Sequence, residues 1–384
     1  MGIKVTVNSI AMAIMLVSVT SIPVSAEYRE DTWLANVIGP ELLEKGDEFG
    51  CQAPHDSEYL GNFDFVGACK DYLNGRINSS RWGVDPISFA TPKGNISPEF
   101  ARALHKAGFT IIGDLSQTED QNFTVINRNG GSIESGLANR SLIESIEEGS
   151  LVSLYWVARV DDMNIRRDRQ LVSWILEQDY WFTTWGEWVT HQRSSLRITV
   201  HANSTHLTFT NPEGGPWRTP GTIFYDSQGK SSSLSWSDEQ YNELGIDDRI
   251  LRAGYRNVTD RGIYITIPQG ESVSVERIDG GEINFQPTLF NGLEKGLTIA
   301  GHHATNMREW SQDFSDTPLR FTWLVEREEI PAPSLLLPAL AMSVLIATPI
   351  AIRHIIAKDR THLKVGPLME TPEPLISETI RDIA

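Results

Sequence analysis

Leu151-Val-Ser-Leu-Tyr-Trp-Val157 is an uncharged, largely apolar run with the length of a buried strand. The stretch from Asp168 to Gln178 follows it, with Leu171 and Ile175 at the spacing of one helix face, and Tyr180-Trp-Phe-Thr-Thr184 is a second strand-like run. Two strands connected through a helix pair in parallel, because the crossover returns the chain to the same end of the sheet. This segment therefore predicts an α/β layer or a (β/α) barrel.

The same alternation is found upstream. Pro98 to Lys106 is a predicted helix, with proline at its first position and Ser97 as its N-cap. Gly108 ends this helix, and Phe109-Thr-Ile-Ile112 has the pattern of a short buried strand. We therefore expect an α/β domain over residues 27–194.

The pattern changes near Arg193. From there on, apolar and polar residues alternate in short runs that are separated by Gly, Pro and Asn, and helical spacing is scarce. The runs are Ser195 to Ala202, His206 to Thr210, Gly221 to Tyr225, Gly262 to Ile267, Ser272 to Ile278 and Leu319 to Val325. Short strands at this spacing predict a second domain, an antiparallel β-sandwich over residues 195–330.

The N-terminus has the three parts of a secretory signal. Lys4 supplies a basic start, an apolar run extends from Ile10 to Val19, and Val24-Ser-Ala26 has the small residues of a cleavage site. The apolar run is shorter than the roughly 20 residues that span a bilayer. We predict a signal peptide over residues 1–26.

A second apolar segment lies near the C-terminus. Residues 332–352 carry no charge, and at 1.5 Å per residue they span about 31 Å, the thickness of a bilayer core. The basic residues that follow are Arg353, Lys358, Arg360 and Lys364. By the positive-inside rule we predict a transmembrane helix over residues 332–353, a cytoplasmic tail over residues 354–384 and an ectodomain outside the cell membrane.

The composition of the predicted ectodomain limits its partners. The chain has a formal net charge of −17, nearly all of it between the two apolar segments, which argues against nucleic acid and anionic lipid. The only two cysteines, Cys51 and Cys69, fall in the ectodomain, where an oxidising compartment favours a disulfide. Six N-x-[ST] sequons fall there too, which predicts a glycoprotein in a cell with the glycosylation machinery; the asparagines are Asn78, Asn95, Asn122, Asn139, Asn203 and Asn257.

Three stretches of the first predicted domain carry a family resemblance. The first is Glu44-Lys-Gly-Asp-Glu-Phe-Gly50 with Cys51-Gln-Ala-Pro-His-Asp56. The second is Phe89-Ala-Thr-Pro-Lys-Gly94 with Ala107-Gly-Phe-Thr-Ile-Ile112, and the third is the strand–helix–strand unit that ends at Glu187. In this order they resemble the G-H-E-x-G-x-H-T-x-x-H segment, the F-R-P-P-x-G … L-x-x-x-G-[FY] segment and the last unit of the polysaccharide deacetylase (NodB-homology) family.

The resemblance implies a distorted (β/α) barrel and a metal-dependent amide hydrolase that acts on N-acetylated sugars. In the family, one carboxylate and two histidines hold a divalent metal such as zinc, which activates water, and a late histidine protonates the leaving amine. The histidine pair corresponds here to Gln52 and Asp56 or, with a one-residue deletion, to Cys51 and His55. His55 and Asp56 are therefore the candidate metal ligands of an active enzyme.

Other positions depart from the family pattern. No Asp-Asp pair stands between Ala26 and Cys51, where the family has its first barrel strand. Ala90 replaces the arginine of the second segment, and Trp156 stands where the family has the leaving-group histidine. Either the barrel has lost its chemistry, or the upstream third of the domain is missing from this sequence. The resemblance thus predicts an incomplete deacetylase-like barrel, followed by the β-sandwich and one transmembrane helix.

Two further groups of side chains are candidates for binding. Trp181, Trp185 and Trp188 are clustered, and tryptophan rings stack on sugar rings, so the three are candidate glycan contacts; the alternative is that they lie in the core. His302 and His303 are adjacent on a predicted strand and would point to opposite faces, which argues against a shared metal ion.

We therefore predict a single-pass cell-membrane protein with a polysaccharide deacetylase-like ectodomain that is catalytically inactive and binds a glycan or a surface protein. One alternative is an active, zinc-dependent carbohydrate de-N-acetylase that uses His55 and Asp56. The other is a structural or adhesive cell-surface protein.

Overall fold

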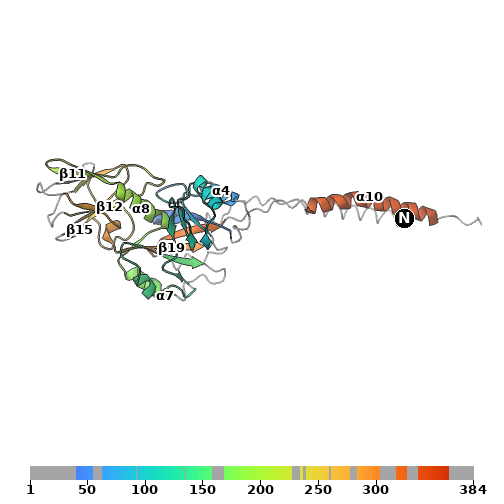
Figure 1. The fold of residues 1–384 in the computed structure, drawn as a ribbon, viewed down its shortest axis with the longest axis horizontal. Helices are drawn as coiled ribbons and strands as arrows, with labels where there is room; N and C mark the ends of the chain where they lie inside the picture. Colours follow the sequence, from blue (N-terminus) through green and yellow to red (C-terminus); the bar gives the residue numbers. More distant parts are fainter. Residues whose placement is uncertain are drawn as a thin grey trace, which may run out of the picture. The chain divides into compact units, whose positions relative to one another are not determined.

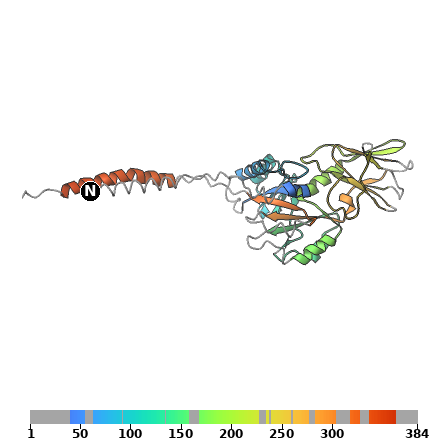
Figure 2. The same cartoon turned by 180° about the vertical axis from the view of Figure 1, so that it is seen from behind.

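The computed structural model describes residues 40–54, 63–91, 93–133, 135–157, 168–226, 234–236, 239–258, 261–276, 283–302, 317–326 and 336–362. Contacts divide the chain into two compact units, Met1–Glu328 and Glu329–Ala384. Figures 1 and 2 show the ribbon from opposite sides. The predicted signal peptide, residues 1–26, lies outside the described residues, so its prediction stands untested.

The larger unit is built on a sheet in which every pairing is parallel. Its strands are β1 (Glu48–Gln52), β2 (Ser88–Ala90), β4 (Ile111–Gly113), β6 (Thr124–Ile126), β7 (Ser132–Ile133), β8 (Leu151–Val157), β9 (Tyr180–Phe182), β19 (Lys295–His302) and β20 (Phe321–Glu326). The order across the sheet is β6-β4-β2-β1-β20-β19-β8-β7, and β9 pairs with the start of β19.

This order requires the sheet to curl. The edge strands β6 and β7 would lie roughly 34 Å apart in a flat sheet, at about 4.8 Å per strand. Only residues 127–131 connect them, and six residue steps reach at most about 21 Å. Around the curl, starting from β1, the strands come in chain order: β1, β2, β4, β6, β7, β8, β19 and β20. The last strand, β20, pairs with the first, β1. The predicted curled, parallel α/β sheet is confirmed.

Helices cover the outer side of the sheet. They are α4 (Asp64–Asn74), α5 (Pro98–Ala107), α6 (Arg140–Glu144) and α7 (Arg169–Glu177), and the short helix α3 (Pro40–Lys45) precedes β1. The predicted ends of α5 are confirmed, since Phe100 N donates to Ser97 Oγ at 3.1 Å and Gly108 adopts a φ of 89°. Apolar side chains of α4, α5 and α7 form one cluster with the outward-facing side chains of the strands, including Phe49, Phe89 and Trp156.

Helix α8 (Trp185–Arg197) lies between the parallel sheet and the strands that follow it, as both views show (Figures 1 and 2). Its first turns belong to a second apolar cluster on the inner side of the sheet, which includes Ala90, Tyr155 and Leu324. Its polar side chains face the next layer: His191 Nε2 lies 2.9 Å from Thr222 Oγ1. Burial lowers the pKa of His191 to about 3, so this imidazole is neutral and serves as a structural hydrogen-bonding group.

Two antiparallel sheets follow α8. The first contains β10 (Thr199–Ala202), β11 (His206–Thr210), β17 (Ser272–Glu276), β13 (Leu234–Trp236) and β14 (Glu239–Gln240). The second contains β15 (Gly254–Val258), β16 (Gly262–Ile267), β12 (Gly221–Tyr225) and β18 (Phe285–Pro287). Side chains of both sheets, such as Phe209 and Ile265, share one core cluster. The predicted antiparallel sheets are confirmed.

The C-terminal limit of the predicted sandwich needs correction. The run Leu319 to Val325 was predicted as a sandwich strand, but it contains β20, which pairs in parallel with β1 and β19. After β18, the 3-10 turn Phe290–Gly292 leads into β19, so the chain has returned to the parallel sheet. The antiparallel sheets are therefore an insertion in the parallel fold. Alternation along a strand identifies a strand with two different faces, but it does not identify the sheet that the strand joins.

The smaller unit contains helix α10 (Leu336–His362). Its segment Leu340–Lys358 has a mean hydropathy of 1.8 and is long and apolar enough to cross a membrane. The helix overlaps the predicted transmembrane segment, residues 332–353, and extends into the predicted tail. Membrane insertion and its direction remain predictions.

Candidate functional site

The carboxyl ends of parallel strands meet at one end of a curled sheet, and ligand sites of α/β folds lie there. At this end the structure describes Thr91 after β2, Asp114 and Ser116 after β4, and Arg128 after β6. Arg128 contacts Asp114 and Tyr155 of β8, and Thr91 is hydrogen-bonded to Ser116. We call these five residues the carboxyl-end cluster and treat it as the candidate site.

Arg128 bridges the opening between the edge strands β6 and β7. Its Nε and Nη2 donate to the two carboxylate oxygens of Asp114, and its Nη1 donates to Ser132 Oγ at 3.0 Å. Its Cζ lies 3.8 Å from the ring centroid of Tyr155, in cation–π contact. Ser132 belongs to β7 and Tyr155 to β8, whereas Asp114 follows β4. The Arg128 side chain therefore links the β4–β6 side of the sheet to the β7–β8 side, which no backbone pairing between the described strands joins directly.

Asp114 is half of an ion pair. Its side chain is only 10 % exposed, and that of Arg128 is 23 % exposed. Burial raises the pKa of Asp114, and the charge and hydrogen bonds of Arg128 oppose that rise. A carboxylate that accepts a bidentate arginine has little capacity left to take a proton or bind a metal ion. The pair is suited to holding the site in shape and not to acid–base catalysis.

The backbone at Asp114 and Leu115 is left-handed at two successive non-glycine residues, with φ of 67° and 74°. This conformation costs roughly 1–2 kcal/mol per residue and is concentrated at ligand sites. Hydrogen bonds of 3.1 Å from Asp114 N to Ile126 O and from Gly94 N to Leu115 O hold it in place. The turn leaves the Leu115 side chain 38 % exposed at this end of the sheet.

Hydroxyl groups form the layer below this turn. Thr91 Oγ1 and Ser116 Oγ share a short hydrogen bond, and Ser116 Oγ lies 2.5 Å from Gly113 O. Ser116 belongs to β5 (Ser116–Gln117), which pairs with β3 (Gly94–Asn95) in a small parallel sheet formed by the connections after β4 and β2. Asn127 Nδ2 donates to Ser116 O at 3.1 Å. Amide, hydroxyl and apolar groups are thus placed side by side.

A second polar cluster lies at the amino end of β1. Glu48 is buried, and its two oxygens accept from Ser88 Oγ at 2.6 Å and from Gly186 N at 2.7 Å. Burial raises the pKa of Glu48 to about 7 in spite of these hydrogen bonds. Gly186 belongs to the first turn of α8, so Glu48 satisfies a backbone donor that the helix itself leaves unpaired.

The neighbouring carboxylates are also fully engaged. Glu187 accepts from Arg81 Nη2 at 3.0 Å and from Trp82 Nε1 at 2.5 Å. Asp47 accepts from the backbone N–H of Phe321 at 3.0 Å, and burial raises its pKa to about 6. Groups at this end of a parallel barrel serve stability. We therefore assign this cluster to anchoring α8 and β20.

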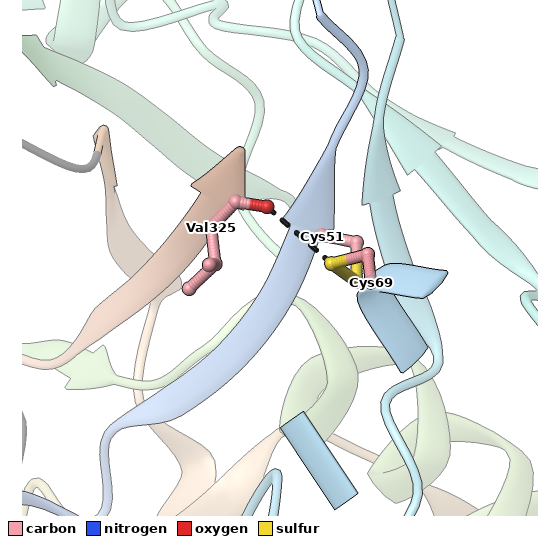
Figure 3. Close-up of a disulfide and its surroundings, with 3 residues drawn as sticks. All are labelled: Cys51, Cys69 and Val325. Atoms are coloured by element: carbon pink, nitrogen blue, oxygen red, sulfur yellow. Dashed lines mark hydrogen bonds between the residues drawn. A yellow bond between two sulfur atoms is a disulfide. The ribbon is translucent and has the colours of Figure 1, made fainter. Parts of the chain in front are cut away.

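The predicted disulfide is confirmed. Cys51 in β1 and Cys69 in α4 are bonded, with their Cα atoms 6.1 Å apart (Figure 3). The dashed line in Figure 3 joins Cys69 Sγ to Val325 O at 3.4 Å; because a disulfide sulfur carries no hydrogen, this is a packing contact between α4 and β20. With its sulfur bonded to Cys69, Cys51 is not available as the metal ligand of the alternative alignment.

The two predicted metal ligands, His55 and Asp56, are not among the residues that the structure describes. His303 also lies outside them, and His302 is the last residue of β19. Within the described ranges, no group of three His, Cys, Asp or Glu residues could hold a metal ion. The described residues therefore do not by themselves supply a zinc site, and zinc binding by His55 and Asp56 remains a prediction.

The predicted glycan contacts need correction. Trp181, Trp185 and Trp188 are 0 %, 1 % and 6 % exposed, and all three belong to the inner cluster around α8. Their rings fill the space between the sheet and α8, so they offer no face to a sugar from solvent. The core alternative is the one that the structure supports.

Two positions of the family comparison are also clarified. Ala90 ends β2 on the inner side of the sheet, as expected for a residue near a site. Trp156 is buried on the outer side, against the helices, whereas its neighbour Tyr155 lies on the inner side. A proton donor for a ligand inside the curl would therefore have to stand at position 155 or 157, and not at 156.

Comparison with known proteins found no matching family model, no similar curated protein and no similar solved structure. The deacetylase resemblance therefore rests on the quoted motifs.

Neither Asp114 nor Arg128 was predicted as a site residue from the sequence. A signal for Asp114 was present, because it directly follows the predicted strand Phe109 to Ile112 and one glycine, at the end of the sheet where ligands bind. Arg128 gave no comparable signal. Its partners lie in the turn after β4, in β7 and in β8, and only the curl of the sheet brings them together.

Proposed function

We propose that this chain is a single-pass, membrane-anchored extracytoplasmic protein whose curled parallel sheet binds a glycan or a surface protein without hydrolysing it. The observation that carries the proposal is the carboxyl-end cluster. At the end where α/β folds bind ligands, Asp114 and Arg128 neutralise each other in an ion pair, and the same turns carry amide and hydroxyl groups and the exposed Leu115 side chain.

Two observations support the location, and a third concerns the partner. The disulfide between Cys51 and Cys69 is typical of oxidising compartments. Helix α10 has the length and hydropathy of a membrane span, and basic residues follow its apolar segment. The acidic charge of the remaining chain favours neutral or basic partners over nucleic acid.

The proposal is tested with the full chain in detergent micelles. Binding of N-acetylated chitin oligomers and of peptidoglycan fragments is measured by titration calorimetry, acetate release by an enzymatic assay, and bound metal by elemental analysis. Leu115→Ala removes an exposed side chain of the turn, and Ile246→Ala removes a similarly exposed one in the inserted domain. If a bound ligand covers Leu115, losing that apolar contact costs about 1.5 kcal/mol, which weakens binding about tenfold. We expect this effect from Leu115→Ala and not from Ile246→Ala.

The other predicted functions give different results. Stoichiometric zinc together with acetate release that is abolished by His55→Ala would establish the active de-N-acetylase. If neither alanine variant changed the binding affinity, the carboxyl-end cluster would not be the binding site. Failure to bind either class of glycan, with a surface protein captured instead, would favour the protein partner over the sugar.

A further inference from the structure

All six sequon asparagines lie on the surface of the folded chain. Each side chain is exposed: Asn78, Asn95, Asn122, Asn139, Asn203 and Asn257. Exposure alone does not make an asparagine reactive, because the amide nitrogen must be free of competing hydrogen bonds. The sequon hydroxyl two residues later must also be accessible to the transferring enzyme. These two conditions divide the six sites.

Asn203 meets both conditions. It lies at the turn between β10 and β11, and its Oδ1 accepts from Thr205 N at 2.9 Å and from His206 N at 2.6 Å. These bonds use only the oxygen, and Nδ2 donates to no described residue. Thr205, which carries the sequon hydroxyl, is exposed; its Oγ1 donates to Asn203 Oδ1 at 3.2 Å and lies 2.9 Å from His206 Nδ1.

Asn139 and Asn95 have the same properties. Asn139 is the N-cap of α6, with Oδ1 accepting from Leu142 N at 2.9 Å, and its sequon residue Ser141 is exposed. Asn95 ends β3, and its side chain makes no hydrogen bond to a described residue. Its sequon residue Ser97 is exposed, and its Oγ accepts from Phe100 N at 3.1 Å as the N-cap of helix α5.

The other three sequons are hindered in the folded chain. At Asn122 and Asn257, Nδ2 donates to a carboxylate, at 2.8 Å and 3.4 Å respectively. The sequon of Asn78 ends in Ser80, which is 3 % exposed. In the folded chain the amide nitrogen of Asn122 and Asn257 is thus engaged by a carboxylate, and the hydroxyl of the Asn78 sequon is buried.

We propose that Asn95, Asn139 and Asn203 are N-glycosylation sites that stay open on the folded chain. The inference rests on the extracytoplasmic location in the proposed function. Nδ2 attacks the anomeric carbon of an oligosaccharide carried on a lipid phosphate. An N–C bond forms, the C–O bond to phosphate breaks, the phosphate leaves with the electron pair, and the Nδ2 proton passes to solvent. Oδ1 remains an acceptor, so the helix cap at Asn139 and the turn at Asn203 persist.

The test uses the full chain inserted into membrane vesicles that contain an oligosaccharyltransferase. The lipid-linked oligosaccharide is added only after the Cys51–Cys69 disulfide has formed. Protease protection reports the location of the ectodomain, and mass spectrometry after endoglycosidase treatment reports the occupancy of each site. We expect glycan at Asn95, Asn139 and Asn203, with lower occupancy at the other three.

Variants of the sequon hydroxyl separate modification from folding. Ser141→Ala should abolish the glycan at Asn139 while leaving the asparagine cap in place, and Ser141→Thr should retain it. A protected ectodomain without glycan at the three sites would overturn the inference and leave the proposed location standing. Equal glycan occupancy at all six sites would overturn the inference that the folded structure determines which sequons are modified. An unprotected ectodomain would contradict the proposed location and this inference with it.

Discussion

Replacing Glu48 by glutamine should raise the free energy of unfolding, relative to the native protein, more above neutral pH than at acid pH. Glutamine keeps an oxygen for Gly186 N and a nitrogen that can donate to Ser88 Oγ, the two partners of Glu48. It removes the charge that burial penalises, since burial raises the pKa of Glu48 from 4.5 to about 7. At about 1.4 kcal/mol per pKa unit, the ionised carboxylate costs the fold about 3 kcal/mol.

The sign follows from proton binding. Between pH 4.5 and about 7 the folded state keeps a proton on Glu48 that the unfolded state has lost, so the stability of the native protein falls as pH rises through this range. The Glu48→Gln variant lacks that decline. The difference in unfolding free energy between variant and native protein should therefore shift by about 3 kcal/mol in favour of the variant across the range. Asp47 titrates in both proteins and cancels in the difference.

Urea unfolding of the full chain in detergent, followed by tryptophan fluorescence, measures this difference at about pH 4.5 and about pH 8. Glu99→Gln is the matched control, because Glu99 forms an exposed ion pair with Arg102 on α5 and should show no such shift. If the unfolding free energies of the native protein and of Glu48→Gln depended on pH in the same way, the conclusion that Glu48 is a buried carboxylate with a raised pKa would be refuted.

Three further outcomes are expected from the same unfolding assay. Cys51→Ser together with Cys69→Ser should cost about 3 kcal/mol, because the disulfide closes a loop of 18 residues; reduction of the native protein should cost a similar amount. Gly113→Ala should destabilise by about 1–3 kcal/mol, because its Cβ would lie 2.3 Å from a buried tryptophan ring, whereas Gly67→Ala, with open space around its Cβ in helix α4, should be neutral or stabilising. Ser97→Ala should cost about 1 kcal/mol through loss of the α5 cap, and Ser97→Thr should restore most of it.

Local features of this fold could be predicted from the sequence because their causes are local. The start of α5 is decided by Ser97 and the proline after it, and its end by Gly108, all within a dozen residues. The disulfide followed from the presence of only two cysteines in the predicted ectodomain. In each case, residues that are close in sequence, or have no competitor, determine the outcome.

Features that depend on distant partners could not be predicted in this way. Strand β20 alternates like a sandwich strand, and only its pairing with β1 reveals that it completes the parallel sheet. From the sequence, the tryptophans around α8 were candidates for a sugar cleft or for a core, and the position of α8 against the sheet decided for the core. Likewise, Arg128 acquires its role from Asp114 and Tyr155, which lie 14 and 27 residues away in the chain.

The pairing of β1 with β20 also has a consequence for biogenesis. Asp47 and Phe321, which are hydrogen-bonded in the folded chain, are separated by 274 residues. Contacts of such long range form late, because a large loop must close before they contribute any free energy. A ribosome or translocon that releases the chain from its N-terminus delivers β1 long before its neighbour β20, and the whole antiparallel insertion emerges in between. The free edge of β1 is exposed to misfolding and to chaperones for that interval, so the pairing of β1 with β20, rather than formation of the individual strands, is the step that should limit the yield of native protein.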